Sequence, residues 1–215
     1  MIKDLRELVD IQQFKKLNKK ANKLWEDEKS LEVLPLLALS LAHLKEYKKA
    51  FEYIQKCEQS LEELSLDSKV DLAGVYALLH RVEDAISLLE PIIKKEPEHS
   101  LALARLSWCY FQVDKIDEAI KLYKKSSQIN SNRIPVYSGL AKLYLEEKDI
   151  FHAQESLDKG VNHLSFIENK MPDEAIELFK TQFEELQLNI WVVQDNFISI
   201  ENYLVEKSSL DEEQY

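Results

Sequence analysis

The chain has 215 residues, of which 45% are hydrophobic and 31% charged, and its formal net charge is −11. Three glycines and five prolines are few for this length, which is typical of helices joined by tight turns and untypical of strands. The negative charge argues against a nucleic-acid binder, because phosphate contacts need clustered Lys and Arg.

Membrane spans and exported disulfide-rich folds are also disfavoured. No run reaches about 18 uninterrupted apolar residues, and the first ten residues, MIKDLRELVD, carry charges where a signal peptide needs an apolar centre. Cys57 and Cys109 form no CxxC pair and are expected to be small buried residues. We therefore predict a cytoplasmic protein that binds neither nucleic acid nor a membrane.

Residues 1–30 are predicted to form an N-terminal capping region. Phe14, Leu17, Ala21 and Leu24 follow one face of a helix whose remaining face carries lysines. These are Lys15, Lys16, Lys19, Lys20 and Lys23. A basic amphipathic helix can lie on an anionic membrane or bind an acidic partner, but we favour a helix that covers the first repeat and turns its lysines to water.

A repeated unit follows. Alanines recur at Ala50, Ala85, Ala119 and Ala153, at spacings of 35, 34 and 34 residues. Thirteen residues before each alanine stands a leucine, followed at once by a small residue. Each block has two apolar stripes at helical spacing with a short polar turn between them, which predicts a helix-turn-helix unit. Small residues on both helices would let the two backbones approach closely.

The order of Leu72, Ala73, Tyr76, Ala85 and Pro97 resembles the tetratricopeptide repeat family. The resemblance extends over four blocks, at residues 31–65, 66–99, 100–133 and 134–167. It implies an all-α solenoid whose first helices line a concave surface and whose second helices form the convex one.

The C-terminal part departs from the period. The motif DEAI occurs at residues 117–120 and again at 173–176, but Ala153 and Ala175 are only 22 residues apart, too few for a fifth helix pair. The second motif therefore predicts a single helix begun by Pro172 that caps the stack. Capping helices are expected over residues 168–207, with a disordered acidic tail at 208–215.

A second C-terminal helix is predicted from a stripe of apolar residues. The stripe consists of Ile190, Val193, Phe197, Ile200 and Leu204, at the spacing of a narrow helical seam. We favour packing of this seam against the preceding helix. Two alternatives are that it folds into the concave groove, or that residues 190–204 mediate self-association.

The sequence contains no constellation that predicts catalysis. The glycines Gly74, Gly139 and Gly160 are too scattered for a phosphate-binding loop. The five histidines show neither HxxxH nor HExxH spacing. We therefore expect a protein that is not an enzyme and that uses no cofactor and no metal.

A partner-binding groove is predicted on the first helices. Its floor is expected to be apolar, because a Trp and a Phe that face the same groove are costly to leave uncovered. A partner peptide, the C-terminal seam or the neighbouring first helices could cover them. The candidate residues are Leu39, Val70, Arg81, Leu101, Ala104, Arg105, Trp108, Phe111, Lys115, Lys142 and Leu145.

The resemblance also bears on one class of partner, the C-terminal tails of heat-shock chaperones. Family members that hold the C-terminal carboxylate of heat-shock chaperones do so with Lys, Asn and Arg side chains. Only Arg105 stands where that set has its arginine, and the other positions hold Pro35, Leu39, Asp71 and Leu101. Recognition of chaperone tails is therefore disfavoured.

The sequence thus predicts an interaction scaffold that holds a peptide or helix of a partner protein in a partly apolar concave groove. Two alternatives stay open. The chain could be a soluble chaperone that shields hydrophobic segments of a client during assembly or secretion. It could also be the docking domain of a larger enzyme.

Overall fold

The computed structural model describes residues 1–131 and 133–212. Within these residues the regular structure is helical and contains no strand, which confirms the predicted all-α class. The chain divides after Val136 into two compact units, and each is described by itself. In the described part of the chain, no helix is both long enough and apolar enough to cross a membrane.

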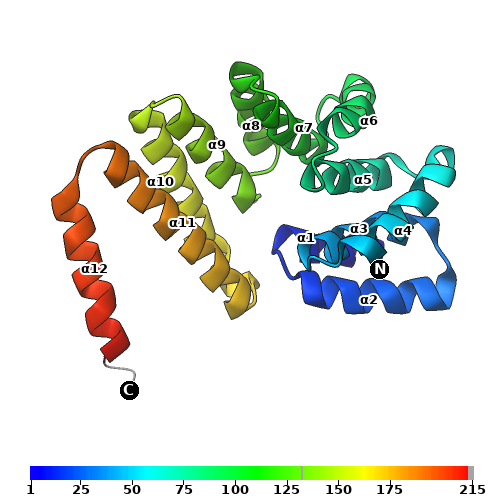
Figure 1. The fold of residues 1–215 in the computed structure, drawn as a ribbon, viewed down its shortest axis with the longest axis horizontal. Helices are drawn as coiled ribbons and strands as arrows, with labels where there is room; N and C mark the ends of the chain where they lie inside the picture. The colour runs from blue at the N-terminus through cyan, green and yellow to red at the C-terminus, as the bar shows by residue number, and fades with distance from the viewer. Residues whose placement is uncertain (132, 213–215) are drawn as a thin grey trace. The chain divides into compact units, whose positions relative to one another are not determined.

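The first unit consists of antiparallel helix pairs that follow one another along the chain (Figure 1). Each first helix packs against its own partner and against the next first helix, for example α3 against α4 and α5. The helices are α1 (Ile2–Asp10), α2 (Phe14–Glu28), α3 (Leu34–His43), α4 (Tyr47–Gln59), α5 (Leu66–Leu78), α6 (Val82–Lys95), α7 (Ser100–Gln112), α8 (Ile116–Ile129) and the start of α9 (Ile134–Glu146).

Small residues hold the two helices of each pair close together, as the period predicts. Ser107 on α7 and Ala119 on α8 are fully buried, and the Ser107 hydroxyl donates to the Ala119 carbonyl oxygen. The corresponding residues of the other pairs are equally buried: Ala38, Ala50, Ala73, Ala85, Ala141 and Ala153. The recurring alanines therefore mark the helix contacts that define the repeat.

In the described part of the chain, one type of helix-helix turn recurs six times. A residue with positive φ ends the first helix, and the next backbone N–H donates to the carbonyl five residues earlier, as in Lys115 N to Tyr110 O at 2.9 Å. This is the Schellman type of helix end. The positive-φ residues are Gln12, Lys45, His80, Asp114, Lys148 and Asp195. The turn at Gln12 shows that residues 1–30 form a helix pair, α1 and α2.

The N-terminal pair packs on the first repeat. Leu17, Ala21 and Leu24 of α2 are buried together with Leu36 and Leu37 of α3. The shorter helix α1 contributes two buried leucines to the same cluster. The core continues without interruption through α3, α4, α5, α6 and α7, so the cap and the repeats share their apolar interior with their neighbours.

The second unit contains the rest of α9, then α10 (Ile150–Ile167), α11 (Asp173–Val193) and α12 (Phe197–Glu212). Helix α11 packs along α10 and buries Phe179, Phe183, Leu186 and Ile190. Gly160 of α10 lies where an added Cβ would be 2.6 Å from the Phe183 ring. The close approach of these two helices therefore depends on that glycine.

The predicted start of the last helix is wrong. Ile190 and Val193 belong to α11, which ends at Val193, and α12 begins only at Phe197. The apolar spacing continues across the turn at Asp195, so the stripe alone did not reveal the break. The side chains of Phe197 and Ile198, which the stripe included, lie outside the described residues.

Helix α12 is held to α11 by polar contacts. The Tyr203 hydroxyl donates to Glu184 at 3.0 Å, and the Lys207 ammonium pairs with the same carboxylate at 2.7 Å. Helix α12 continues to Glu212, past residue 208, where the acidic tail was predicted to begin, and residues 213–215 lie outside the described part.

Candidate functional site

The first unit contains an apolar pocket on the inner side of its helices. Its volume is about 370 Å³, which is at the lower end of the range of roughly 300–1,000 Å³ for ligand sites. The floor comes from α3, α5 and α7, and the remaining wall from the end of α1 and from residues 133–136. Most of the lining is apolar: Val9, Phe14, Leu39, Ala77, Leu78, Leu101, Ala104, Trp108, Pro135 and Val136.

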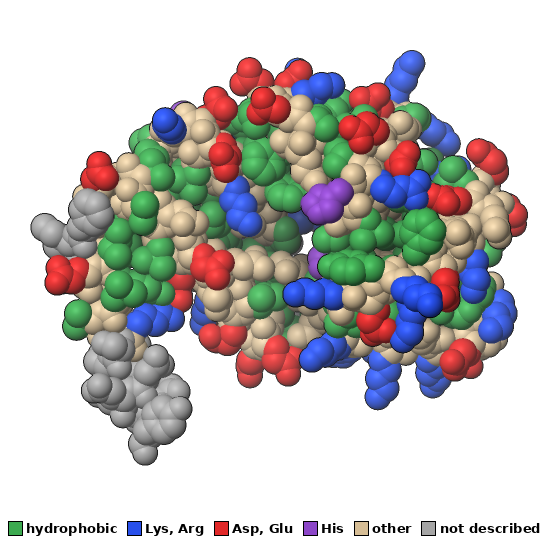
Figure 2. All heavy atoms as spheres, viewed as in Figure 1, with side chains coloured by type: hydrophobic (Ala, Val, Ile, Leu, Met, Phe, Trp, Pro, Cys, Tyr) green, Lys and Arg blue, Asp and Glu red, His purple; other side chains and the backbone are tan. Residues whose placement is uncertain are grey.

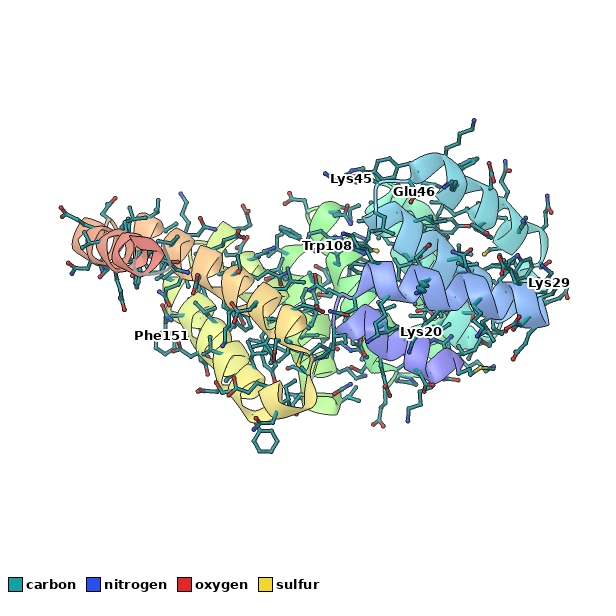
Figure 3. The ribbon with its side chains drawn as sticks, turned by 90° about the horizontal axis from the view of Figure 1, so that it is seen from below. Lys20, Lys29, Lys45, Glu46, Trp108 and Phe151 are labelled. Carbon is teal, nitrogen blue, oxygen red and sulfur yellow. The ribbon has the colours of Figure 1, made fainter. Side chains whose placement is uncertain are left out.

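Trp108 stands at the pocket as a partly exposed aromatic side chain. It is 38% exposed, and its ring lies 5.4 Å from that of Phe111, tilted by 53°. A tryptophan that keeps this much surface in water, beside an apolar hollow, is the type of residue that dominates protein interfaces when it is covered. Figure 3 labels Trp108 on α7.

Two stacked rings, one of them an imidazole, and one carboxylate complete the lining of the pocket. His43 at the end of α3 stacks on Phe14, with ring centroids 3.6 Å apart. Desolvation, followed by the positive charge of Arg105, lowers the pKa of His43 to about 4. The imidazole is therefore neutral at pH 7, although the residue itself keeps contact with water. Asp10 pairs with Arg133 on the opposite wall.

Helix α1 is tied across the inner side by ion pairs to distant segments. Arg6 pairs with Asp71 at 2.8 Å and with Asp67 at 2.9 Å, and Asp10 pairs with Arg133. These contacts join residues more than 60 positions apart. They make α1 a wall of the pocket, where the sequence predicted only a helix covering the first repeat.

Arg105 lies between the pocket and a buried carboxylate. Its guanidinium donates to Asp71 at 3.1 Å and to the backbone carbonyl of Val70, and it packs over Gly74, where a Cβ would be 2.8 Å from Nε. Burial lowers the pKa of Arg105, and the charge of Asp71 opposes this. Arg105 is thus already paired with a carboxylate inside the protein.

The structure brings together about half of the predicted groove. Leu39, Leu101, Ala104, Arg105 and Trp108 all line the pocket, and Phe111 adjoins it through Trp108. Residues outside the candidate list also line the pocket. Some belong to the repeats: His43, Gly74, Ala77, Leu78 and Tyr123. The others come from α1, α2, the turn between them and residues 133–136, and no periodic signal in the sequence marks this second group, because most of it lies outside the repeated first helices.

The other predicted residues lie elsewhere. Val70 is fully buried in the core, because its side of α5 faces the neighbouring helices. Arg81 lies over the Tyr76 ring and pairs with Glu58, and Lys115 lies over Tyr110. Arg81 and Lys115 each immediately precede the second helix of a pair, and each side chain lies over a tyrosine on the first helix of the same pair. Lys142 and Leu145 belong to the second unit, where Lys142 is exposed and Leu145 half-buried.

The described residues offer no metal site, since no group of three or more His, Cys, Asp or Glu side chains among them is placed to hold an ion. Cys57 and Cys109 are both buried, as predicted. Burial raises the pKa of each thiol to about 12. The arrangement thus offers an apolar cavity with a tryptophan at its edge.

Comparison with known proteins identifies one segment of the chain. The family model described as tetratricopeptide repeat matches residues 77–125, which run from the end of α5 into α8. The chain thus contains a tetratricopeptide repeat segment. The match covers residues 77–99 of the second predicted block and 100–125 of the third, where the sequence pattern is most complete. Proteins built from tetratricopeptide repeats are in general interaction modules that bind protein partners.

One curated relative is similar to about half of the chain. It is the uncharacterized protein ycf37 of Porphyra purpurea, with 27% identity over 109 residues, covering 49% of this chain and 63% of the relative. The chain therefore matches less than two thirds of that protein's length.

Solved structures share the fold of the tetratricopeptide repeats. TTC0263, a thermophilic TPR protein of Thermus thermophilus, superposes with a TM-score of 0.60 at 17% identity, over 87% of this chain and 97% of that one. Pseudomonas aeruginosa pilF gives 0.57 at 18% identity, over 91% and 95%. A crystal structure of MamA gives 0.51 at 19%, over 77% and 96%. At these identities the likeness shows the fold alone.

Proposed function

We propose that the first unit is a peptide-binding module whose pocket beside Trp108 receives an apolar anchor side chain of a partner protein. The observation that carries this proposal is the cavity of about 370 Å³ with a mostly apolar lining. A pocket of this size holds one large side chain and its neighbours, and deep anchors of this kind supply much of the affinity of a peptide complex.

The pocket wall formed by α1 limits how a partner segment could enter the pocket. An open groove would accept a long extended segment, whereas Asp10 and Arg133 join across this pocket. The partner segment is therefore proposed to present its anchor end-on or as one face of a helix. Arg105 stays with Asp71 in this mode and does not hold a terminal carboxylate.

The two other predicted roles, a chaperone and a docking domain of a larger enzyme, stay predictions, as does the expectation of a cytoplasmic protein that is not an enzyme. A chaperone would bind many unrelated apolar segments weakly. An anchor pocket should select a sequence. The same selection experiment therefore separates the two roles.

The proposal is tested with a phage-displayed library of random dodecapeptides. Selection on the intact chain should yield peptides that share one large apolar residue, and synthetic copies should bind saturably. Ala104→Trp, which fills the pocket, and Trp108→Ala, which removes its edge, should each weaken binding about tenfold or more. Phe51→Ala removes an exposed aromatic from α4 and is the matched control. Equal binding by all variants would contradict the proposal.

A further inference from the structure

A second surface, separate from the pocket, lies on the outer side of α2. Leu17, Ala21 and Leu24 are buried against the first repeat, so the residues about half a turn away face outward. These are lysines, and all are exposed. The lysine face consists of Lys15, Lys16, Lys19, Lys20 and Lys23. Lys and Arg side chains project along this side of the first unit in Figure 2.

The charges of the lysine face are not neutralised by the protein itself. Within residues 1–131 and 133–212, other lysines form ion pairs: Lys49 with Glu46, Lys159 with Glu155, and Lys207 with Glu184. Within the same residues, the α2 lysines form none. From Lys15 to Lys23 the helix rises about 12 Å, so five charges are concentrated on a short face, and the acids of α2 begin only at Glu26.

The chemistry of the lysine face favours a diffuse anionic partner. Protein interfaces are enriched in aromatic residues and Arg and depleted in Lys. A lysine ammonium is a hydrated point charge without the fork geometry that fits one carboxylate. The two large aromatic residues of α2 are both half-buried and have other contacts: Phe14 stacks on His43, and Trp25 contacts Lys29 and Lys56. The face therefore has charge without a specific anchor.

We propose that the lysine face of α2 binds the anionic headgroup surface of a lipid bilayer. The attraction is electrostatic only, because the apolar side of α2 is already buried against α3 and has nothing to insert between lipid chains. This differs from amphipathic helices that sink into the interface with their apolar face.

The overall charge of −11 does not oppose this binding. Residues 1–136 contain 22 Lys and Arg against 22 Asp and Glu, whereas residues 137–215 contain six against 17. The first unit is thus neutral, and the negative charge belongs to the second. At physiological salt, charges more than about 8 Å apart are largely screened in water. The attraction between the lysine face and an anionic surface therefore depends on the charges of the face itself and not on the net charge of the protein.

The experiment uses the intact chain and vesicles in a co-sedimentation assay at about 50 mM salt. Phosphatidylcholine vesicles should bind little, and vesicles that also contain phosphatidylserine should bind well, with the binding lost at about 500 mM salt. Substitution of Lys16, Lys19, Lys20 and Lys23 by Gln should weaken binding about a hundredfold or more, since each lysine contributes roughly fivefold.

The matched control removes the same charge from other exposed positions: Lys48, Lys94, Lys95 and Lys121, each to Gln. It should bind as the unchanged chain does, and circular dichroism should show equal helicity for both variants. Equal loss in both variants would mean that total charge matters and would overturn the assignment to α2. Binding to polyglutamate without binding to phosphatidylserine vesicles would assign the face to an acidic protein instead.

Discussion

Arg6 on α1 donates from Nε to the carboxylate of Asp71 on α5 at 2.8 Å, and Arg105 on α7 donates to the other oxygen at 3.1 Å. The Asp71 side chain is 1% exposed, so a buried charge depends on two partners from different helices. The pair fixes α1 and α7 to the same residue. The pocket wall and the pocket floor therefore share one support.

Substitution of Asp71 should be strongly destabilising. Asp71→Ala leaves Arg105 buried without its counter-charge, and breaking a buried pair in this way costs about 3–5 kcal/mol. The free energy of unfolding in urea measures the effect. Asp67→Ala, which removes the exposed partner of Arg6, should cost no more than about 1 kcal/mol. Equal losses for the two variants would show that Asp71 has no special role.

The positive-φ turns predict a stabilising substitution. His80 ends α5 with φ of 59°, a conformation that costs a non-glycine residue about 1–2 kcal/mol. Glycine adopts this conformation without that cost, but it also makes the unfolded chain more flexible, which offsets part of the gain. His80→Gly should therefore raise the free energy of unfolding by about 0.5–1 kcal/mol. His163→Gly, in the middle of α10, should instead destabilise. A loss of stability at position 80 would count against this view of the turn.

Gly160 is predicted to be intolerant of a methyl group. A Cβ there would lie 2.6 Å from the Phe183 ring on α11 and 3.0 Å from the Tyr137 Cβ on α9, so the substitution would require both neighbours to shift. Gly160→Ala should cost about 1–3 kcal/mol, despite the better helix propensity of alanine. Thermal unfolding followed by circular dichroism measures this. Phe183→Leu in the same chain should restore part of the loss.

The two cysteines should report opening of the first unit. Cys57 and Cys109 are fully buried in its core, and burial raises the pKa of both thiols to about 12, so little thiolate is present at pH 8. Reaction with a maleimide should be slow in the native protein and fast in urea, as mass spectrometry would show. Rapid native labelling of either cysteine would contradict the packing described above.

The repeats could be predicted from the sequence because their signal is periodic. The alanine at each helix contact recurs at nearly constant spacing, because a small buried residue is needed at the same place in every helix pair. The wall of the pocket could not be predicted in this way. Arg6 and Asp71 are 65 positions apart, and their pairing depends on where α1 lies after folding, which no local pattern specifies.

Helix α12 shows a second limit. Ile190 and Val193 continue the spacing of the residues after the turn, so one stripe suggested one helix. The break depends on the backbone at Asp195, where φ is 54°. Because the turn residues here are Gln, Asp and Asn, without Gly or Pro, the sequence offered only a weak stop signal.

The central claim is that the pocket beside Trp108 is where a partner binds, and methyl NMR of the intact chain tests it most directly. On titration with a library-selected peptide, the methyl groups of Leu39, Ala77 and Leu101, which line the pocket, should shift most. Leu178 and Val192, which are exposed on α11, should not shift. Perturbations confined to α11, with an unchanged pocket, would contradict the claim.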